Sequence, residues 1–217
     1  MNVFLLLFKG FAVGLVFSAT TVAATVWCLH LGLRRGLVQA WTAAVGVAVA
    51  QALWAALAAV TVWMLAQQNP QYMAGARVLS AMVFWYMAVK MLRTPRLEQL
   101  PTMDSPGVTG WRLAATTMAV MLSMHMRFFG NVGFFLAAGV VQPRLAPTGA
   151  GLLVIGVGAG TLLWFGLVGA LAAGLRTHAP EEWWVQAVGR LTRMAVVVYG
   201  MLAIIVALPP VIQFMQR

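Results

Sequence analysis

The stretch Ser123-Met-His-Met-Arg-Phe-Phe-Gly-Asn-Val-Gly133 lies inside an apolar segment that runs from Leu113 to Val141. That segment is longer than the about 20 apolar residues that a helix needs to cross a bilayer. Arg127 stands near its middle, where inserting a charge costs about 2.5 to 3.5 kcal/mol. Such a residue normally faces the interior of a helix bundle or a wet cavity and finds a partner there. The stretch therefore predicts a bundle of membrane helices with a polar site inside it.

The composition of the whole chain agrees with a membrane bundle. Hydrophobic residues make up 62% of the 217 residues and charged residues 8%, whereas soluble domains average about 25% charged residues. The mean hydropathy is +0.89. No hydrophilic stretch is long enough to fold separately, so we expect an all-α membrane protein with one transmembrane domain over residues 1–217. Six segments are predicted to span: Asn2–Leu29, Leu37–Ala66, Ala74–Leu92, Leu113–Val141, Gly149–Leu175 and Trp183–Leu208.

The longest polar connection covers residues 93–112 and contains Pro95, Pro101 and Pro106. It divides the chain into two halves of three spans each, residues 1–92 and residues 113–217. An odd number of spans in each half reverses the orientation of the second half, which is the arrangement that an inverted repeat produces. We therefore predict two three-helix halves related as an inverted repeat.

The cations predict the topology. The net charge is +10, but the basic residues do not form one patch, so we expect no nucleic-acid partner. The odd-numbered loops and their flanks carry most of them, and by the positive-inside rule these loops are cytoplasmic and both termini extracytoplasmic. The cytoplasmic set is Arg34, Arg35, Lys90, Arg93, Arg96, Arg112, Arg176, Arg190 and Arg193, and the opposite side has Lys9, Arg77, Arg144 and Arg217.

Small residues at four-residue spacing mark close helix packing. Gly10 and Gly14 recur on one face of the first span, and Gly156 and Gly160 on one face of the fifth. Small residues let helix backbones approach each other closely in lipid.

The hydroxyls of Thr20 and Thr21 follow the glycines of the first span. They either bond back to a carbonyl one turn earlier or line a path through the bundle.

The polar residues of the fourth span divide into two faces. Ser123, Arg127 and Asn131 are four residues apart and share one side of a continuous helix, whereas His125 points elsewhere. His125 is either a neutral, hydrogen-bonded histidine or a group that titrates near neutral pH.

No Asp or Glu occurs within any predicted span, so Arg127 has no intramembrane carboxylate to pair with. Its partner is either a set of backbone carbonyls and water or an anionic group of a substrate, since the guanidinium is a planar fork of donors. Gln51, in the second span, either joins two helices by a hydrogen bond or lines a pathway. The sequence contains no phosphate loop, metal-ligand spacing or Ser-His-acid set, so we expect no cofactor, no metal and no enzymatic activity.

Most of the chain resembles the LysE/RhtB family of small bacterial amino-acid exporters. The segment Leu29–Gly36, which reads Leu-His-Leu-Gly-Leu-Arg-Arg-Gly, is similar to the family's basic first loop, and Ala81–Arg93 is similar to its third helix. Trp164–Arg176 and Gly189–Arg193 resemble parts of its fifth and sixth helices. The resemblance implies export of amino acids or related metabolites across the bacterial cytoplasmic (inner) membrane, driven by an ion gradient.

The chain departs from the family pattern at three places. The Pro-Gly-Pro-Asn motif of the first helix falls on Thr21–Ala24, and the acidic residue of the second helix falls on Gln51. The Asn-Pro-Lys motif of the fourth helix falls either on Phe128–Gly130 or, with a shift of three residues, on His125–Arg127. The residues that normally break these two helices are therefore missing, and both segments are predicted as single spans.

Two hypotheses follow. The first is a LysE-type exporter of small carboxylate-bearing metabolites that acts in the lipid bilayer, alone or as a homo-oligomer. Its substrate site consists of Arg127, Asn131, Ser123, Gln51, Thr20 and Thr21. The alternative is a divergent membrane subunit that no longer transports and instead packs against a partner membrane protein.

Overall fold

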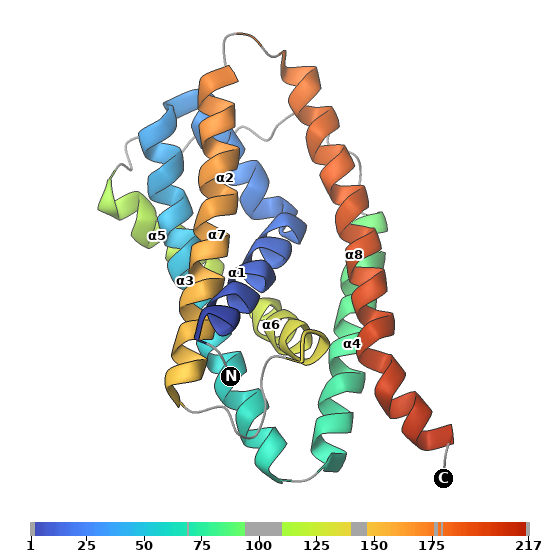
Figure 1. The fold of residues 1–217 in the computed structure, drawn as a ribbon. Coiled ribbons are helices and arrows are strands. Elements are labelled where there is room, and N and C mark those ends of the chain that lie inside the picture. The colour runs from blue at the N-terminus through green and yellow to red at the C-terminus, as the bar shows by residue number, and fades with distance from the viewer. Residues whose placement is uncertain are drawn as a thin grey trace.

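The computed structural model describes residues 3–68, 70–93, 110–139, 147–175, 178 and 180–215. In these residues the chain forms α-helices and no strands, as the apolar composition predicts (Figure 1). The helices are α1 (Val3–Thr20), α2 (Val22–Arg35), α3 (Leu37–Gln68), α4 (Pro70–Arg93), α5 (Trp111–Leu122), α6 (Met126–Ala137), α7 (Pro147–Leu175) and α8 (Glu181–Met215).

Five of these helices, α1, α3, α4, α7 and α8, are long and apolar enough to cross a membrane. The pair α5 and α6 makes a sixth span if the two are counted as one broken helix, since they are bent by 75° at their junction. The predicted class of multi-span helical membrane protein is thus confirmed, with five or six spans. Most of the predicted connection, residues 94–109, lies outside the described residues.

The first predicted span is not continuous, because the helix breaks at Thr21. The hydroxyls of Thr20 and Thr21 both donate to the carbonyl of Phe17, at 2.8 and 2.9 Å, and the amide of Thr21 bonds to the carbonyl of Ser18 at 3.0 Å. These bonds occupy carbonyls at the end of α1, so the chain can turn there without proline. The prediction of one helix over Asn2–Leu29 was wrong.

The fourth predicted span, Leu113–Val141, is also broken. The hydroxyl of Ser123 donates to the carbonyl of Val120 at 2.7 Å, and the indole Nε1 of Trp54 donates to the carbonyl of Met121 at 3.3 Å. Two carbonyls at the end of α5 are therefore satisfied by side chains. Both segments that lack the proline motifs are broken nonetheless. Threonine hydroxyls bind the free carbonyl at the first break, and a serine hydroxyl and a tryptophan indole bind the free carbonyls at the second.

The glycines of α1 and α7 pack as the sequence predicts. A Cβ atom on Gly10 or Gly14 would overlap the carbonyl oxygen of Leu153 or Val157 of α7. Gly160 in turn approaches the backbone of α1 with no room for a side chain. The two helices thus cross with their backbones in contact, which only small residues permit.

Around this crossing the helices form two groups. Helix α7 packs against α1, α2 and α3, and α3 also packs against α5 and α6. Helices α4 and α8 lie side by side and pack mainly against each other (Figure 1). We call them the α4–α8 pair; it meets the other helices chiefly through α6 and α1.

Candidate functional site

A buried hydrogen-bond network joins α3 to α6 at the centre of the bundle. Gln51 Nε2 donates to Asn131 Oδ1 at 2.9 Å, and Arg127 Nη1 donates to Gln51 Oε1 at 3.0 Å. Asn131 Nδ2 closes the network by donating to the backbone carbonyl of Arg127 at 2.8 Å. The side chains are 0%, 0% and 4% exposed for Gln51, Asn131 and Arg127. Of the alternatives for Gln51, a bond between helices is present.

Arg127 keeps two donors that this network does not use. Its Nε and Nη2 atoms are buried and have no hydrogen-bond partner among the described residues. These two nitrogens lie on the same edge of the guanidinium, so their N–H groups are parallel and form one fork. A fork of this kind matches the two oxygens of a carboxylate.

Ser123 does not join Arg127 and Asn131. The predicted shared face requires one continuous helix through all three residues, and the break between α5 and α6 separates Ser123 from the other two. Ser123 is exposed, and its hydroxyl is bound to the carbonyl of Val120. The prediction that Ser123, Arg127 and Asn131 share one side of a helix was therefore wrong for Ser123. Arg127 and Asn131 do share one side of α6.

Thr20 and Thr21 lie at the break between α1 and α2, with their hydroxyls directed to the carbonyl of Phe17. The ring of Phe17, in turn, packs on Phe134 of α6 with centroids 5.2 Å apart. The two threonines therefore close the end of α1, and Phe17, whose carbonyl they bind, links this end to α6.

Tyr199 is the residue that sequence reasoning missed. It is 3% exposed in the middle of an apolar helix. A buried tyrosine hydroxyl usually finds a hydrogen-bond partner, so a lone tyrosine in an apolar span was a usable signal.

His125 stands apart from this network, as the helical spacing predicts. It is exposed at the start of α6, and its ring centroid is 6.3 Å from that of Trp54. A titrating role for His125 stays a prediction.

Aromatic side chains pack beside the polar network. The ring of Phe134 makes edge contacts with Phe17 at 5.2 Å and with Phe84 at 5.4 Å between centroids. Two glycines of α6 make room for these rings. A Cβ on Gly130 would come within 2.7 Å of the Phe17 ring, and one on Gly133 within 2.5 Å of the Phe84 ring.

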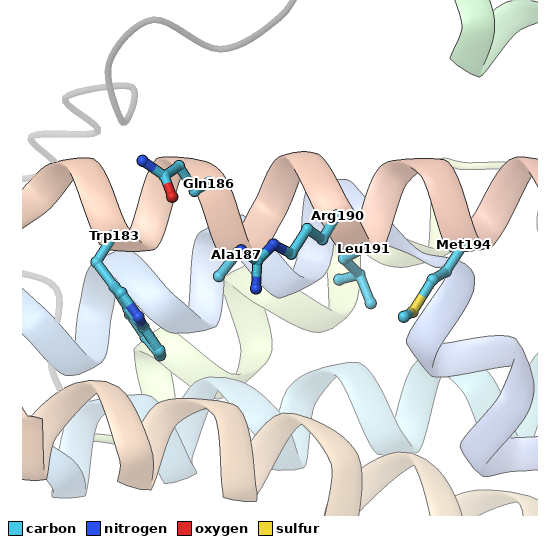
Figure 2. Close-up of a pocket in the computed structure, with 6 residues that line it drawn as sticks. All are labelled: Trp183, Gln186, Ala187, Arg190, Leu191 and Met194. Atoms are coloured by element: carbon cyan, nitrogen blue, oxygen red, sulfur yellow. The ribbon is translucent and has the colours of Figure 1, made fainter.

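A separate groove runs along the exposed side of α8 and has a volume of about 220 Å³ (Figure 2). Arg190 is its charged residue, and it lies about two and a half turns before Tyr199 on a different face of the helix. The groove is therefore not part of the Arg127 region. Its lining residues are Trp183, Gln186, Ala187, Arg190, Leu191 and Met194.

Five apolar helices long enough to cross a membrane, with the bent pair α5 and α6 beside them, define a multi-pass membrane protein. A family model described as LysE type translocator matches residues 14–211, and the chain belongs to this family of membrane transporters. The match supports transport rather than catalysis and confirms the resemblance found in the sequence. No curated protein and no solved structure matches the chain.

Proposed function

We propose that this protein is a LysE-type exporter of amino acids or related small metabolites that carry a carboxylate. The observation that carries the proposal is the unused fork of Arg127, whose Nε and Nη2 donors are buried without a partner among the described residues. Leaving buried donors of a charged group unsatisfied costs free energy, about 1 to 3 kcal/mol for each group. A substrate carboxylate accepts both N–H groups and removes that cost.

Gln51 and Asn131 are proposed to hold the guanidinium of Arg127, which receives the carboxylate, in place. Gln51 accepts from Arg127 Nη1 and donates to Asn131, so it fixes the plane of the guanidinium from the side opposite the fork. An amide in this position leaves the charge of Arg127 uncompensated, because Gln51 is neutral. The charge is then available for an anionic ligand, and Thr20 and Thr21 are proposed to form the nearby hinge.

The inverted repeat is proposed as the basis of transport, with the two halves as predicted. Each half of the chain consists of a broken helix followed by two long helices: α1–α2, α3 and α4, then α5–α6, α7 and α8. The packing pairs agree with such a relation, since α7 packs on α1 and α2 while α3 packs on α5 and α6. With the positive-inside bias, the termini are extracytoplasmic in the bacterial cytoplasmic membrane. The alternative of a non-transporting subunit gains no support from the family match.

The test is Arg127→Ala in purified protein reconstituted into vesicles. Because the coupling ion is not known, uptake is measured by counterflow, in which vesicles loaded with an unlabelled amino acid exchange it for labelled amino acid outside. The twenty L-amino acids are screened on the wild type, and the best substrate is compared with the amine that lacks its carboxylate. We expect exchange of the amino acid but not of the amine, and at least about tenfold less exchange by Arg127→Ala, since a charged hydrogen bond contributes about 1.5 to 3 kcal/mol.

Arg193→Ala is the matched control, because Arg193 is exposed and bonds to the carbonyl of Gly189 in its own helix. It is expected to exchange like the wild type. Size-exclusion profiles and thermal unfolding establish that each variant is folded. Wild-type exchange by folded Arg127→Ala, or equal exchange of the amine, contradicts the proposal.

A further inference from the structure

The groove along α8 has no role in the proposed binding of a carboxylate to Arg127, and its shape indicates a different ligand. Its volume is about 220 Å³, whereas pockets that enclose a small molecule usually measure about 300 to 1,000 Å³. Trp183 and Met194 lie at its two ends and are 49% and 66% exposed, so the groove opens on the outer surface of the bundle. It therefore fits one part of a larger molecule that lies beside α8.

The groove lies near one surface of the membrane. The apolar stretch Glu182–Pro209 of α8 has 28 residues, and at a rise of about 1.5 Å for each residue it is about 42 Å long. A bilayer with its headgroups is about 40 to 45 Å thick, and about 30 Å of this is hydrocarbon. Glu182 is therefore expected at one surface, and the backbone of Arg190, about 12 Å further along α8, lies just inside the hydrocarbon.

Arg190 extends its charge back toward that surface. Figure 2 shows its side chain running along the groove toward Ala187, so that the guanidinium lies on the Trp183 side of its own backbone. An arginine near the end of a span usually takes this course, which keeps its methylene groups in apolar surroundings and brings its charge to the headgroups. Glu182, the one acidic residue whose side chain the structure describes, lies more than two turns earlier in α8. The charge of Arg190 is thus available to an anion from the membrane.

The remaining groups follow the order of a phospholipid from headgroup to acyl chain. Trp183 stands at the outer end, and its ring meets that of Trp184 edge-on with centroids 4.7 Å apart. Trp184 is 4% exposed, so this contact fixes the indole that closes the groove, and tryptophan is enriched at the headgroup level. Leu191 and Met194 lie on the other side of the Arg190 guanidinium and line the deeper end with apolar groups.

We propose that this groove binds an anionic phospholipid of the surrounding membrane. The phosphate accepts hydrogen bonds from the guanidinium of Arg190, whose planar fork matches two phosphate oxygens, and the amide of Gln186 lies one turn away at the same end. One acyl chain lies over Leu191 and Met194. A free phosphate ion uses only the polar end of the groove, and a zwitterionic lipid brings an ammonium group that Arg190 repels.

The experiment measures lipid binding by native mass spectrometry, with purified protein in detergent titrated with phosphatidylglycerol or with phosphatidylcholine of the same acyl chains. We expect phosphatidylglycerol to bind about tenfold more tightly, and Arg190→Ala to lower its affinity by about tenfold, the effect of one charged hydrogen bond. Arg193→Ala is the matched control, because Arg193 is exposed on the same helix but does not line the groove. It is expected to change the affinity by less than about twofold. Equal affinity for the two lipids, or equal losses in the two arginine variants, shows non-specific attraction to the basic protein and overturns the inference.

A second variant tests the groove while leaving its charge in place. Ala187→Phe fills the space between Trp183 and Leu191 and is expected to weaken binding of phosphatidylglycerol by about tenfold. Val197→Phe, at a 54% exposed position of α8 outside the groove, is the control and is expected to bind like the wild type. Unchanged binding by folded Ala187→Phe overturns the inference, and this variant decides alone if Arg190→Ala does not fold.

Glycerol phosphate, which is an anionic headgroup without acyl chains, distinguishes a lipid site from a phosphate site. We expect it to bind at least about tenfold more weakly than phosphatidylglycerol, because it leaves the apolar end of the groove empty. Equal binding of the two overturns the assignment to a lipid. All of these measurements are made without amino acid, so their outcome does not depend on the proposed function.

Discussion

Gln51 and Arg127 are 76 positions apart in the sequence, and their contact determines the electrostatics of the bundle centre. A neutral amide satisfies one nitrogen of the guanidinium and leaves the positive charge uncompensated. In the resemblance to the LysE/RhtB family, the acidic residue often found in the second helix falls on this glutamine. A carboxylate at this place would pair with Arg127 and compete with any anionic ligand.

The first prediction at the residue scale concerns Gln51→Glu. The variant introduces a carboxylate 3.0 Å from Arg127 Nη1, if the side chain keeps its place. We expect affinity for the amino acid to fall by about tenfold or more, because the new carboxylate neutralises the charge of Arg127. The thermal unfolding midpoint is expected to change little, because the new ion pair is offset by the loss of the Gln51 Nε2 donor to Asn131 Oδ1. Gln67→Glu, at an exposed position of α3, is the control for added charge. Unchanged or tighter substrate binding by Gln51→Glu would show that the charge of Arg127 does not serve as an anion receptor.

Single elements of this bundle differ in how strictly packing constrains them. Gly14 of α1 lies against the backbone of α7, whereas at Gly151 and Gly174 of α7 no atom of the described residues lies within 4 Å of an added Cβ. The same residue type thus serves close packing at one position and has no packing role at another. The breaks show the same dependence on context, because Thr21 ends α1 while Thr42 and Thr61 lie within α3 and bond back without breaking it.

Gly14→Ala tests the crossing of α1 and α7. The added methyl group must push the two backbones apart, since it meets the carbonyl oxygen of Val157 and not a flexible side chain. We expect a loss of about 1 to 3 kcal/mol in the free energy of unfolding, typical of an overpacked contact. Gly174→Ala, with open space around it, is the control and is expected to be neutral or to stabilise helix α7 by up to about 1 kcal/mol. Chemical denaturation in detergent measures the free energy of unfolding of each variant. Equal free energies for Gly14→Ala and Gly174→Ala would contradict the close contact between the backbones of α1 and α7.

At the scale of the whole molecule, the packing divides the helices into the α4–α8 pair and a group centred on α3 and α7 (Figure 1). Movement during transport is then expected between the α4–α8 pair and the remaining helices, while α3 and α7 stay fixed against each other.

A disulfide between α3 and α7 tests this division. The Cβ of Ala52 lies 3.5 Å from the position of a Cβ on Gly158, close to the separation of about 3.5 to 4.5 Å found in disulfides. In a Cys28→Ala background, which removes the chain's one cysteine, Ala52→Cys with Gly158→Cys is oxidised and assayed by counterflow. We expect exchange within about twofold of the reduced protein, since a disulfide adds no constraint to helices that already move together. Loss of exchange on oxidation, recovered with a reductant, would mean that α3 and α7 move relative to each other.

The sequence alone determined the class of the protein and much of its packing. Long apolar segments can satisfy their backbone groups in lipid only as helices or closed barrels, so their lengths predicted membrane-spanning helices, and the periodic glycines predicted close packing on one face of the first and of the fifth span. The identity of Arg127, Asn131 and Gln51 as buried polar residues followed from the cost of polar groups at membrane depth. These inferences need only local composition and spacing.

Tertiary structure decided where the helices break and which polar groups meet. The breaks at Thr21 and Ser123 contain no proline, and the second depends on the indole of Trp54, a residue of a different helix, that binds the carbonyl of Met121. The same holds for Tyr199, whose ring stacks on Phe84 only because α8 packs against α4. Hydrogen bonds between residues far apart in the chain depend on how the helices pack together, and spacing along one helix carries no record of that packing.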